Sequence, residues 1–136
     1  MNILFICKHN VFRSRVAEEH MKKISKHNIS SAGLISFSGN MQKEQQEVCK
    51  EFGLILPNQS KTLSLENLRK QDLIIVVADD VPQKIFENPE YNLCKIRRWE
   101  IKDVDTFDLD KKKIRPIVKK IIENVEDLNK SLNKSK

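Results

Sequence analysis

Short apolar runs separated by mixed segments predict four strands of a buried sheet. Asp72–Ala78 is the strongest of these runs because it is both continuous and rich in β-branched residues. In chain order the predicted strands are Asn2–Ile6, Ile29–Ala32, Asp72–Ala78 and Leu93–Ile96. Runs without polar alternation are typical of strands covered on both faces, so we expect helices on both sides of the sheet.

Apolar residues at helical spacing predict helices between these strands. Asn40 and Ser64 are candidate N-caps, and Gly53 stands where a glycine commonly ends a helix. In chain order the predicted helical segments are Ser14 to about Lys26, Asn40 to about Phe52, Leu65–Lys70 and Val81–Phe86.

The last predicted helix carries the most regular apolar stripe. Pro116 conflicts with a helix that starts at Lys111, so the helix either begins near Arg115 or bends at the proline. We expect the folded domain to span residues 1–130 and residues 131–136 to form a basic C-terminal tail. The stripe consists of Ile114, Ile117, Ile121, Val125 and Leu128.

Strands that alternate with helices predict a single α/β domain, with a four-stranded parallel sheet and helices on both faces. The sequence has no internal repeat and no linker-like stretch. In folds of this class, ligands bind at the carboxyl ends of the strands, beside helix N-termini. The loop that follows the first strand is therefore the first candidate for a functional site.

The composition of the chain bears on the compartment in which the protein works and on the kind of molecule that it binds. No apolar run approaches the ~20 residues that span a membrane, and the run Ile3–Ile6 is too short for a signal peptide and lacks an upstream basic segment, so we expect a cytoplasmic protein without membrane contact. The net charge of +6 lies partly in Lys111–Lys113 and in the C-terminal tail. Because no nucleic-acid-binding motif accompanies this charge, we interpret it as solvated lysines and expect no nucleic acid partner.

The cysteines indicate a reducing compartment. Cys7, Cys49 and Cys94 cannot all pair with one another, so at least one thiol is free. None of their spacings is typical of a metal site. We therefore expect neither a metal nor another cofactor.

The segment Cys7–Ser14 carries the chemistry. A strand–loop–helix turn aims backbone N–H groups and the positive end of a helix dipole into one concavity, which suits a tetrahedral oxyanion. Arg13 can add a bidentate grip on such an anion, and the same positive field favours a thiolate on Cys7. The bland alternative makes Cys7 a buried cysteine at a strand end. The predicted phosphate-binding residues are Lys8, His9, Asn10, Val11, Phe12, Arg13 and Ser14.

These residues resemble a known family. The segment Ile3-Leu4-Phe5-Ile6-Cys7-x-x-Asn10-x-x-Arg13-Ser14, followed by Ala17-Glu18, resembles the opening of the low-molecular-weight protein tyrosine phosphatase and thiol-dependent arsenate reductase superfamily. The similarity covers most of the chain in the family's order, although only this first motif is specific. The further matches are Ser31-Ala32-Gly33, Phe52-Gly53-Leu54, Asp72–Val77, and Trp99 with Asp103.

The resemblance implies a metal-free, two-step hydrolysis of phosphate monoesters on a protein or a small molecule, with protein phosphotyrosine as the expected substrate. Cys7 would attack phosphorus to form a cysteinyl-phosphate that water then hydrolyses. Arg13 and the loop amides would stabilise the transferring group, and Asn10 would hold the shape of the loop. Asp103 stands where the family has the aspartate that protonates the leaving oxygen.

The sequence departs from the family pattern near the expected acid. The family's Asp-Pro pair is Asp103-Val104 here, and Asp105 is an alternative acid two residues on. The tyrosines that often follow in the family are replaced by Thr106 and Phe107. Phe37 is therefore another candidate for an aromatic wall beside the substrate.

Three further departures lie in and after the loop. His9 stands where the family usually has glycine, so it is either strained or placed at the pocket mouth, in contact with substrate. Phe12 replaces a second cysteine, which removes the disulfide within the loop that protects such relatives from oxidation. Arg15 replaces the usual proline, a change that the first helical turn accepts.

Two other functions stay open at this stage, and the physiological substrate and oligomeric state are not defined by the sequence. Arsenate reduction needs further cysteines after the strand Asp72–Val77, where this sequence has Asp79-Asp80. A non-catalytic phosphate-binding or phosphocarrier module is the other alternative. Phosphocarrier loops lack an arginine at the place of Arg13, but a binding protein without turnover fits the same residues.

Overall fold

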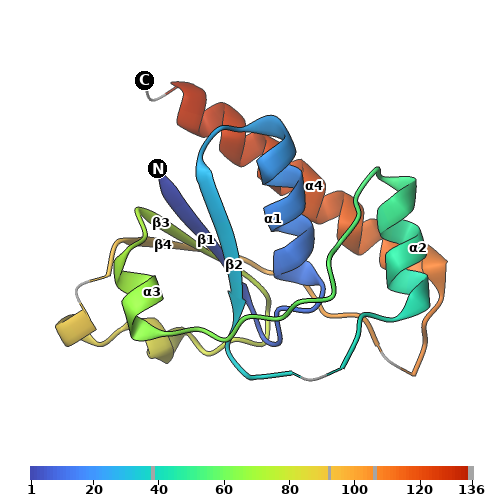
Figure 1. Ribbon diagram of the computed structural model, residues 1–136, viewed down its shortest axis with the longest axis horizontal. Helices are drawn as coiled ribbons and strands as arrows, with labels where there is room; N and C mark the ends of the chain where they lie inside the picture. The colour runs from blue at the N-terminus through green and yellow to red at the C-terminus, as the bar shows by residue number, and fades with distance from the viewer. Residues whose placement is uncertain (38, 92, 106, 135–136) are drawn as a thin grey trace.

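The computed structural model describes residues 1–37, 39–91, 93–105 and 107–134, which contain a parallel β-sheet (Figure 1). The strand order is β2-β1-β3-β4, and every neighbouring pair is parallel. The predicted α/β domain with a four-stranded parallel sheet is therefore confirmed. The strands are β1 (Asn2–Cys7), β2 (Asn28–Gly33), β3 (Leu73–Val77) and β4 (Lys95–Trp99).

Alternate residues of β1 pack on opposite faces of the sheet, as the pleat requires. Ile3 and Phe5 belong to the apolar cluster under the helices Arg13–Ile24, Lys43–Glu51 and Lys111–Lys134, whereas Leu4 and Ile6 belong to the cluster under the helical segments Leu65–Arg69 and Gln83–Phe86. Both faces are thus covered, as predicted (Figure 1). The helical elements are α1 (Arg13–Ile24), α2 (Lys43–Glu51), α3 (Leu65–Arg69), the 3₁₀ turns η1 (Gln83–Phe86) and η2 (Pro89–Tyr91), and α4 (Lys111–Lys134).

β4 lies later in the chain than predicted, at Lys95–Trp99 instead of Leu93–Ile96. It is an edge strand, and its residues are mostly half-buried. Arg97 and Arg98 therefore fit there, although a search for apolar runs misses them.

The ends of the helices are set by side-chain caps. Ser64 accepts a hydrogen bond from the backbone N–H of Asn67 and caps α3, as predicted. α2 begins at Lys43 because Gln42 and Gln45 form a reciprocal capping box, so Asn40 is not its N-cap. Gly53, with φ of 76°, follows the end of α2.

α4 starts at Lys111, so Pro116 lies inside the helix. Both Pro116 and Lys112 are exposed, and water can satisfy the Lys112 carbonyl that the proline leaves without a partner. The helix continues through Lys134, so residues 131–134 are helical rather than an irregular tail. Leu132 extends the apolar stripe and packs against the core. No helix of the described ranges is long and apolar enough to cross a membrane.

Candidate active site

The loop between β1 and α1 closes around Asn10. Asn10 is fully buried and has φ of 56°, and among the described residues it is the only one besides glycine with positive φ. Its side-chain amide donates to Ser14 Oγ at 2.7 Å and to Ser31 Oγ at 2.9 Å, and its Oδ1 accepts from Lys61 N at 2.9 Å. The left-handed conformation thus falls on an asparagine, which tolerates it better than most residues. His9 carries no such strain.

Ser14 is oriented toward the sulfur of Cys7. The two side chains are buried, and Cys7 Sγ lies 3.0 Å from Ser14 Oγ. Because Ser14 Oγ accepts a hydrogen bond from the Asn10 amide, its own hydroxyl proton is available to donate to the sulfur. A hydroxyl in this position can donate a hydrogen bond to the sulfur.

The end of β2 supports the loop from behind. Leu34 N donates to Cys7 O at 3.0 Å, and Gly33 N donates to Lys61 O at 2.7 Å. A Cβ atom on Gly33 would lie 2.6 Å from the carbonyl carbon of His9, so only glycine allows this approach.

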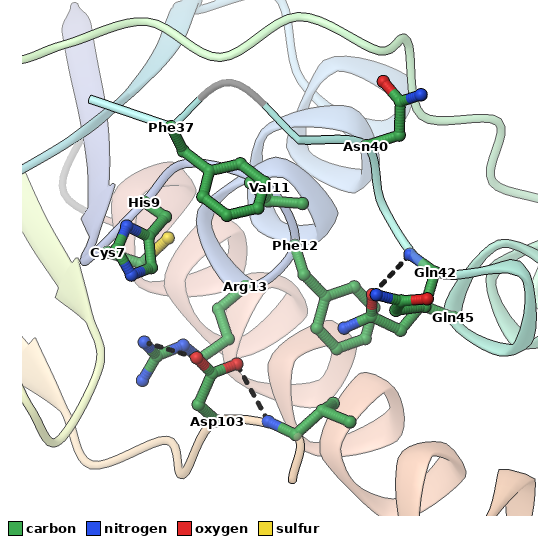
Figure 2. Close-up of a pocket in the computed structure, with 11 residues that line it drawn as sticks. Cys7, His9, Val11, Phe12, Arg13, Phe37, Asn40, Gln42, Gln45 and Asp103 are labelled. Atoms are coloured by element: carbon green, nitrogen blue, oxygen red, sulfur yellow. Dashed lines mark hydrogen bonds and ion pairs between the residues drawn. The ribbon is translucent and has the colours of Figure 1, made fainter. Parts of the chain in front are cut away.

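Arg13 is held under the loop by contacts from two other strand ends. Its side chain is 1% exposed, and its guanidinium donates to Ile101 O and to Asp80 Oδ1, both at 2.9 Å. Asp103 Oδ2 lies 3.5 Å from Arg13 Nη2, as Figure 2 shows. Arg13 Nε is buried and has no hydrogen-bond partner within the described chain. A buried, unpaired cationic donor of this kind favours an anion beside it.

Cys7, Arg13 and Asp103 line one cavity of about 100 Å³. Asp103 Oδ1 accepts the backbone N–H of Val104 at 2.8 Å, which orients the carboxylate at the rim. Asp105 does not line the cavity, and its side chain accepts from Phe107 N. Phe107 is 99% exposed and lies outside the cavity as well, and Thr106 lies outside the described residues. The geometry thus brings Asp103, and not Asp105, to the sulfur and the guanidinium.

The cavity has an aromatic wall. Phe37 and His9 contact each other with ring centroids 5.3 Å apart, and both line the cavity, as does Val11 (Figure 2). Phe12 lines the cavity from its buried side. Of the predicted loop residues, Lys8, Asn10 and Ser14 do not line the cavity. Asn10 and Ser14 form its framework, and Lys8 is half-exposed.

Asn40, Gln42 and Gln45 also line the cavity, and sequence reasoning missed them. In Figure 2 the two glutamine side chains lie beside Phe12, whereas the amide of Asn40 points away from the other lining residues. Asp80 was also missed as a partner of Arg13. The position of Asp80 just after the strongest predicted strand is a usable signal, because carboxyl ends of parallel strands meet at one edge.

The other two thiols are also free and lie in other segments of the chain than Cys7. Cys49 is buried on α2, and burial raises its pKa to about 12. Cys94 precedes β4, at the edge of the sheet opposite to the end of β1, and burial raises its pKa as well. No described cysteine is placed to form a disulfide with Cys7.

Comparisons with known proteins agree with this geometry. The family model for low molecular weight phosphotyrosine protein phosphatase matches residues 2–136. No curated protein matches the sequence significantly.

Solved structures share the fold at low identity. Drosophila arginine phosphatase has a TM-score of 0.81 and 21% identity, over 97% of this chain and 98% of that chain. The tyrosine phosphatase Wzb from Escherichia coli K30, in complex with sulphate, has a TM-score of 0.75 and 18% identity, over 96% and 97%. Arsenate reductase from Archaeoglobus fulgidus has a TM-score of 0.69 and 22% identity, over 93% and 97%.

Proposed function

Because this chain belongs to the low molecular weight phosphotyrosine protein phosphatase family and is a cysteine phosphatase of that type, we propose that it hydrolyses aryl phosphate esters, above all phosphotyrosine in proteins. One observation carries the proposal: Cys7, Arg13 and Asp103 line the same cavity. The unpaired cysteines fit a reducing cytoplasm.

In the first step, Cys7 Sγ attacks phosphorus and the bond to the ester oxygen breaks. The loop amides and Arg13 Nε bind the phosphoryl oxygens, and the protonated carboxyl of Asp103 gives its proton to the leaving oxygen. In the second step, water attacks the cysteinyl-phosphate while Asp103 takes a proton from it. The S–P bond breaks, inorganic phosphate leaves, and the thiolate is restored.

The contact between Asp103 and Arg13 suits this role. The guanidinium lies within ion-pair distance of Asp103. A phosphoryl group held by Arg13 would therefore lie beside the carboxyl of Asp103, where its leaving oxygen can meet the acid.

Aromatic and aliphatic side chains favour an aryl leaving group. Phe37, His9 and Val11 offer a wall against which a phenyl ring packs. N-phosphorylated arginine is the second candidate, because Gln42 lines the cavity and its amide oxygen has a lone pair left beside its bond to the Gln45 backbone N–H, which a guanidinium can use. Arsenate reduction is disfavoured, because a thiol relay needs a second cysteine near Cys7.

Turnover of para-nitrophenyl phosphate by purified protein, without added metal, tests the proposal. We expect hydrolysis by the wild type and a loss of at least about a thousandfold in Cys7→Ser. Binding of phosphate without turnover makes the chain a silent binding module, and activity retained in Cys7→Ser removes that residue as the nucleophile. Matched phosphotyrosine and phosphoarginine peptides then decide between the two substrate classes.

A further inference from the structure

A groove leads away from the catalytic cavity. The cavity shares Val11 with a neighbouring hollow along Pro57–Ser60, and that hollow shares Met41 and Asn58 with a third one of about 70 Å³. The three hollows therefore adjoin one another through shared lining residues, from the cavity at Cys7 to Ile55, and this series of hollows is called the groove below. Figure 1 shows the segment after α2 running toward the loop that follows β1.

The far end of the groove offers an apolar side chain to solvent. Leu54 and Leu56 are buried, whereas Ile55 between them is 78% exposed and lines the third hollow. One exposed isoleucine is ordinary on a protein surface. Ile55, however, lies at the end of hollows that begin at the proposed catalytic cavity. A peptide substrate whose phosphorylated residue occupies that cavity can extend along these hollows to Ile55.

The wall of the groove is fixed to the phosphate-binding loop. Lys61 N donates to Asn10 Oδ1, and Arg15 donates to the carbonyl of Gln59. No backbone–backbone hydrogen bond involves Ile55 or Leu56 in the described chain. An extended peptide can therefore pair with this backbone as it would with a sheet edge.

The side chain of Lys50 adds a positive charge to the groove. Lys50 lines the third hollow, and within the described residues it makes no ion pair. The neighbouring carboxylates are already occupied, since Glu47 pairs with Lys43 and Lys111, and Glu51 pairs with Arg115. An acidic side chain on the occupant would complement Lys50.

We propose that this groove binds the extended segment that flanks the phosphorylated residue of a protein substrate, with an apolar side chain on Ile55 and an acidic one near Lys50. The inference rests on the proposed phosphatase activity and gives it a sequence preference. A free phosphorylated metabolite would not reach Ile55, so the preference belongs to protein substrates.

The test compares para-nitrophenyl phosphate with Gly-Ser-rich phosphotyrosine peptides that carry one Leu-Asp pair at successive positions. We expect one placement to raise wild-type kcat/KM about tenfold, the gain expected from burying one aliphatic side chain. Ile55→Ser should lose most of this gain, and Lys50→Glu should shift the preference from Leu-Asp to Leu-Lys. Leu65→Ser, an exposed leucine on α3 that lines none of these hollows, is the matched control.

Turnover of para-nitrophenyl phosphate should be equal in all of these variants. A wild type that treats every placement alike, or an Ile55→Ser variant that loses both activities equally, overturns the groove. Self-association of the wild type that Ile55→Ser abolishes, measured by sedimentation, overturns it in favour of a second copy.

The proposed function can fail separately from the groove. If the wild type hydrolyses neither substrate, fluorescence anisotropy of the same peptides still reports the groove. Tighter binding of the Leu-Asp peptide to Cys7→Ser than to Cys7→Ser/Ile55→Ser supports it, and equal binding refutes it.

Discussion

The two halves of the proposed active site are built differently. The loop between β1 and α1 is tied by long-range hydrogen bonds, which are buried from Asn10 to Ser31 and from Arg13 to Ile101 and part-buried from Asn10 to Lys61. After the buried Ile101, the described residues that carry Asp103 make mostly local bonds, to residues one to three positions away. We call the loop from Cys7 to Arg13 the anion cup. Among the described contacts, Asp103 is linked to this cup only through Arg13, and its side chain is 43% exposed.

In the proposed mechanism, this difference separates phosphate binding from proton transfer. A cup fixed before substrate arrives pays no reorganisation cost when charge spreads over the phosphoryl group. An acid on a loosely tied segment can approach leaving groups of different size. Changes in the cup should therefore affect every substrate, whereas changes at Asp103 should depend on the leaving group.

The strongest way to break the cup is Arg13→Lys. A lysine keeps the charge but loses the planar fork and the bonds to Ile101 O and Asp80, so we expect kcat/KM to fall about a thousandfold on all substrates. Steady-state kinetics on para-nitrophenyl phosphate and phenyl phosphate measures this. Near-normal turnover would show that Arg13 does not act on the anion.

A smaller and more selective loss is expected from Asp103→Asn. Phenyl phosphate, with its poor leaving group, should slow about a hundredfold, because the amide cannot donate the acid's proton. Para-nitrophenyl phosphate should slow much less, and Asp105→Asn should resemble the wild type on both. If Asp105→Asn shows the selective loss instead, the acid is Asp105.

The smallest expected loss of activity comes from Asn10→Ala, which loosens the cup without touching its charges. The variant loses the bonds to Ser14, Ser31 and Lys61 and places alanine at positive φ, so we expect stability to fall by about 3 kcal/mol and kcat about tenfold. Urea unfolding measures the first and steady-state kinetics the second. Asn10→Gly loses the same hydrogen bonds but adopts positive φ without strain, so it should be about 1 kcal/mol more stable than Asn10→Ala. Equal stability of these two variants would argue against strain at this position.

The order of strands and helices could be predicted from local sequence, because the apolar residues that a strand or helix buries recur within that element with its own period. Asp72–Ala78 and the stripe from Ile114 to Leu128 were recognisable for this reason. The start of α2 was not, because the capping box of Gln42 and Gln45 uses residues that also occur in ordinary loops.

In the site, Cys7 and Arg13 could be predicted from the sequence because they lie close together in the chain, at the two ends of one loop. Asp80 and the amides of Asn40, Gln42 and Gln45 come from other segments, 27 to 67 positions from Arg13. Their approach depends on tertiary packing, which residue spacing does not encode. The rule that strand ends share one edge would have pointed to Asp80, and nothing comparable marks the amides.

The long reach of these ties bears on the life of the chain during its synthesis. Cys7 is synthesised well before the residues that complete its surroundings, because Asn10 bonds to a residue 51 positions later and Arg13 to one 88 positions later. Domains generally fold as units once their contacts are available. A nascent chain that does not yet include Ile101 therefore holds Cys7 without the complete set of contacts around it, and the site is completed late in translation.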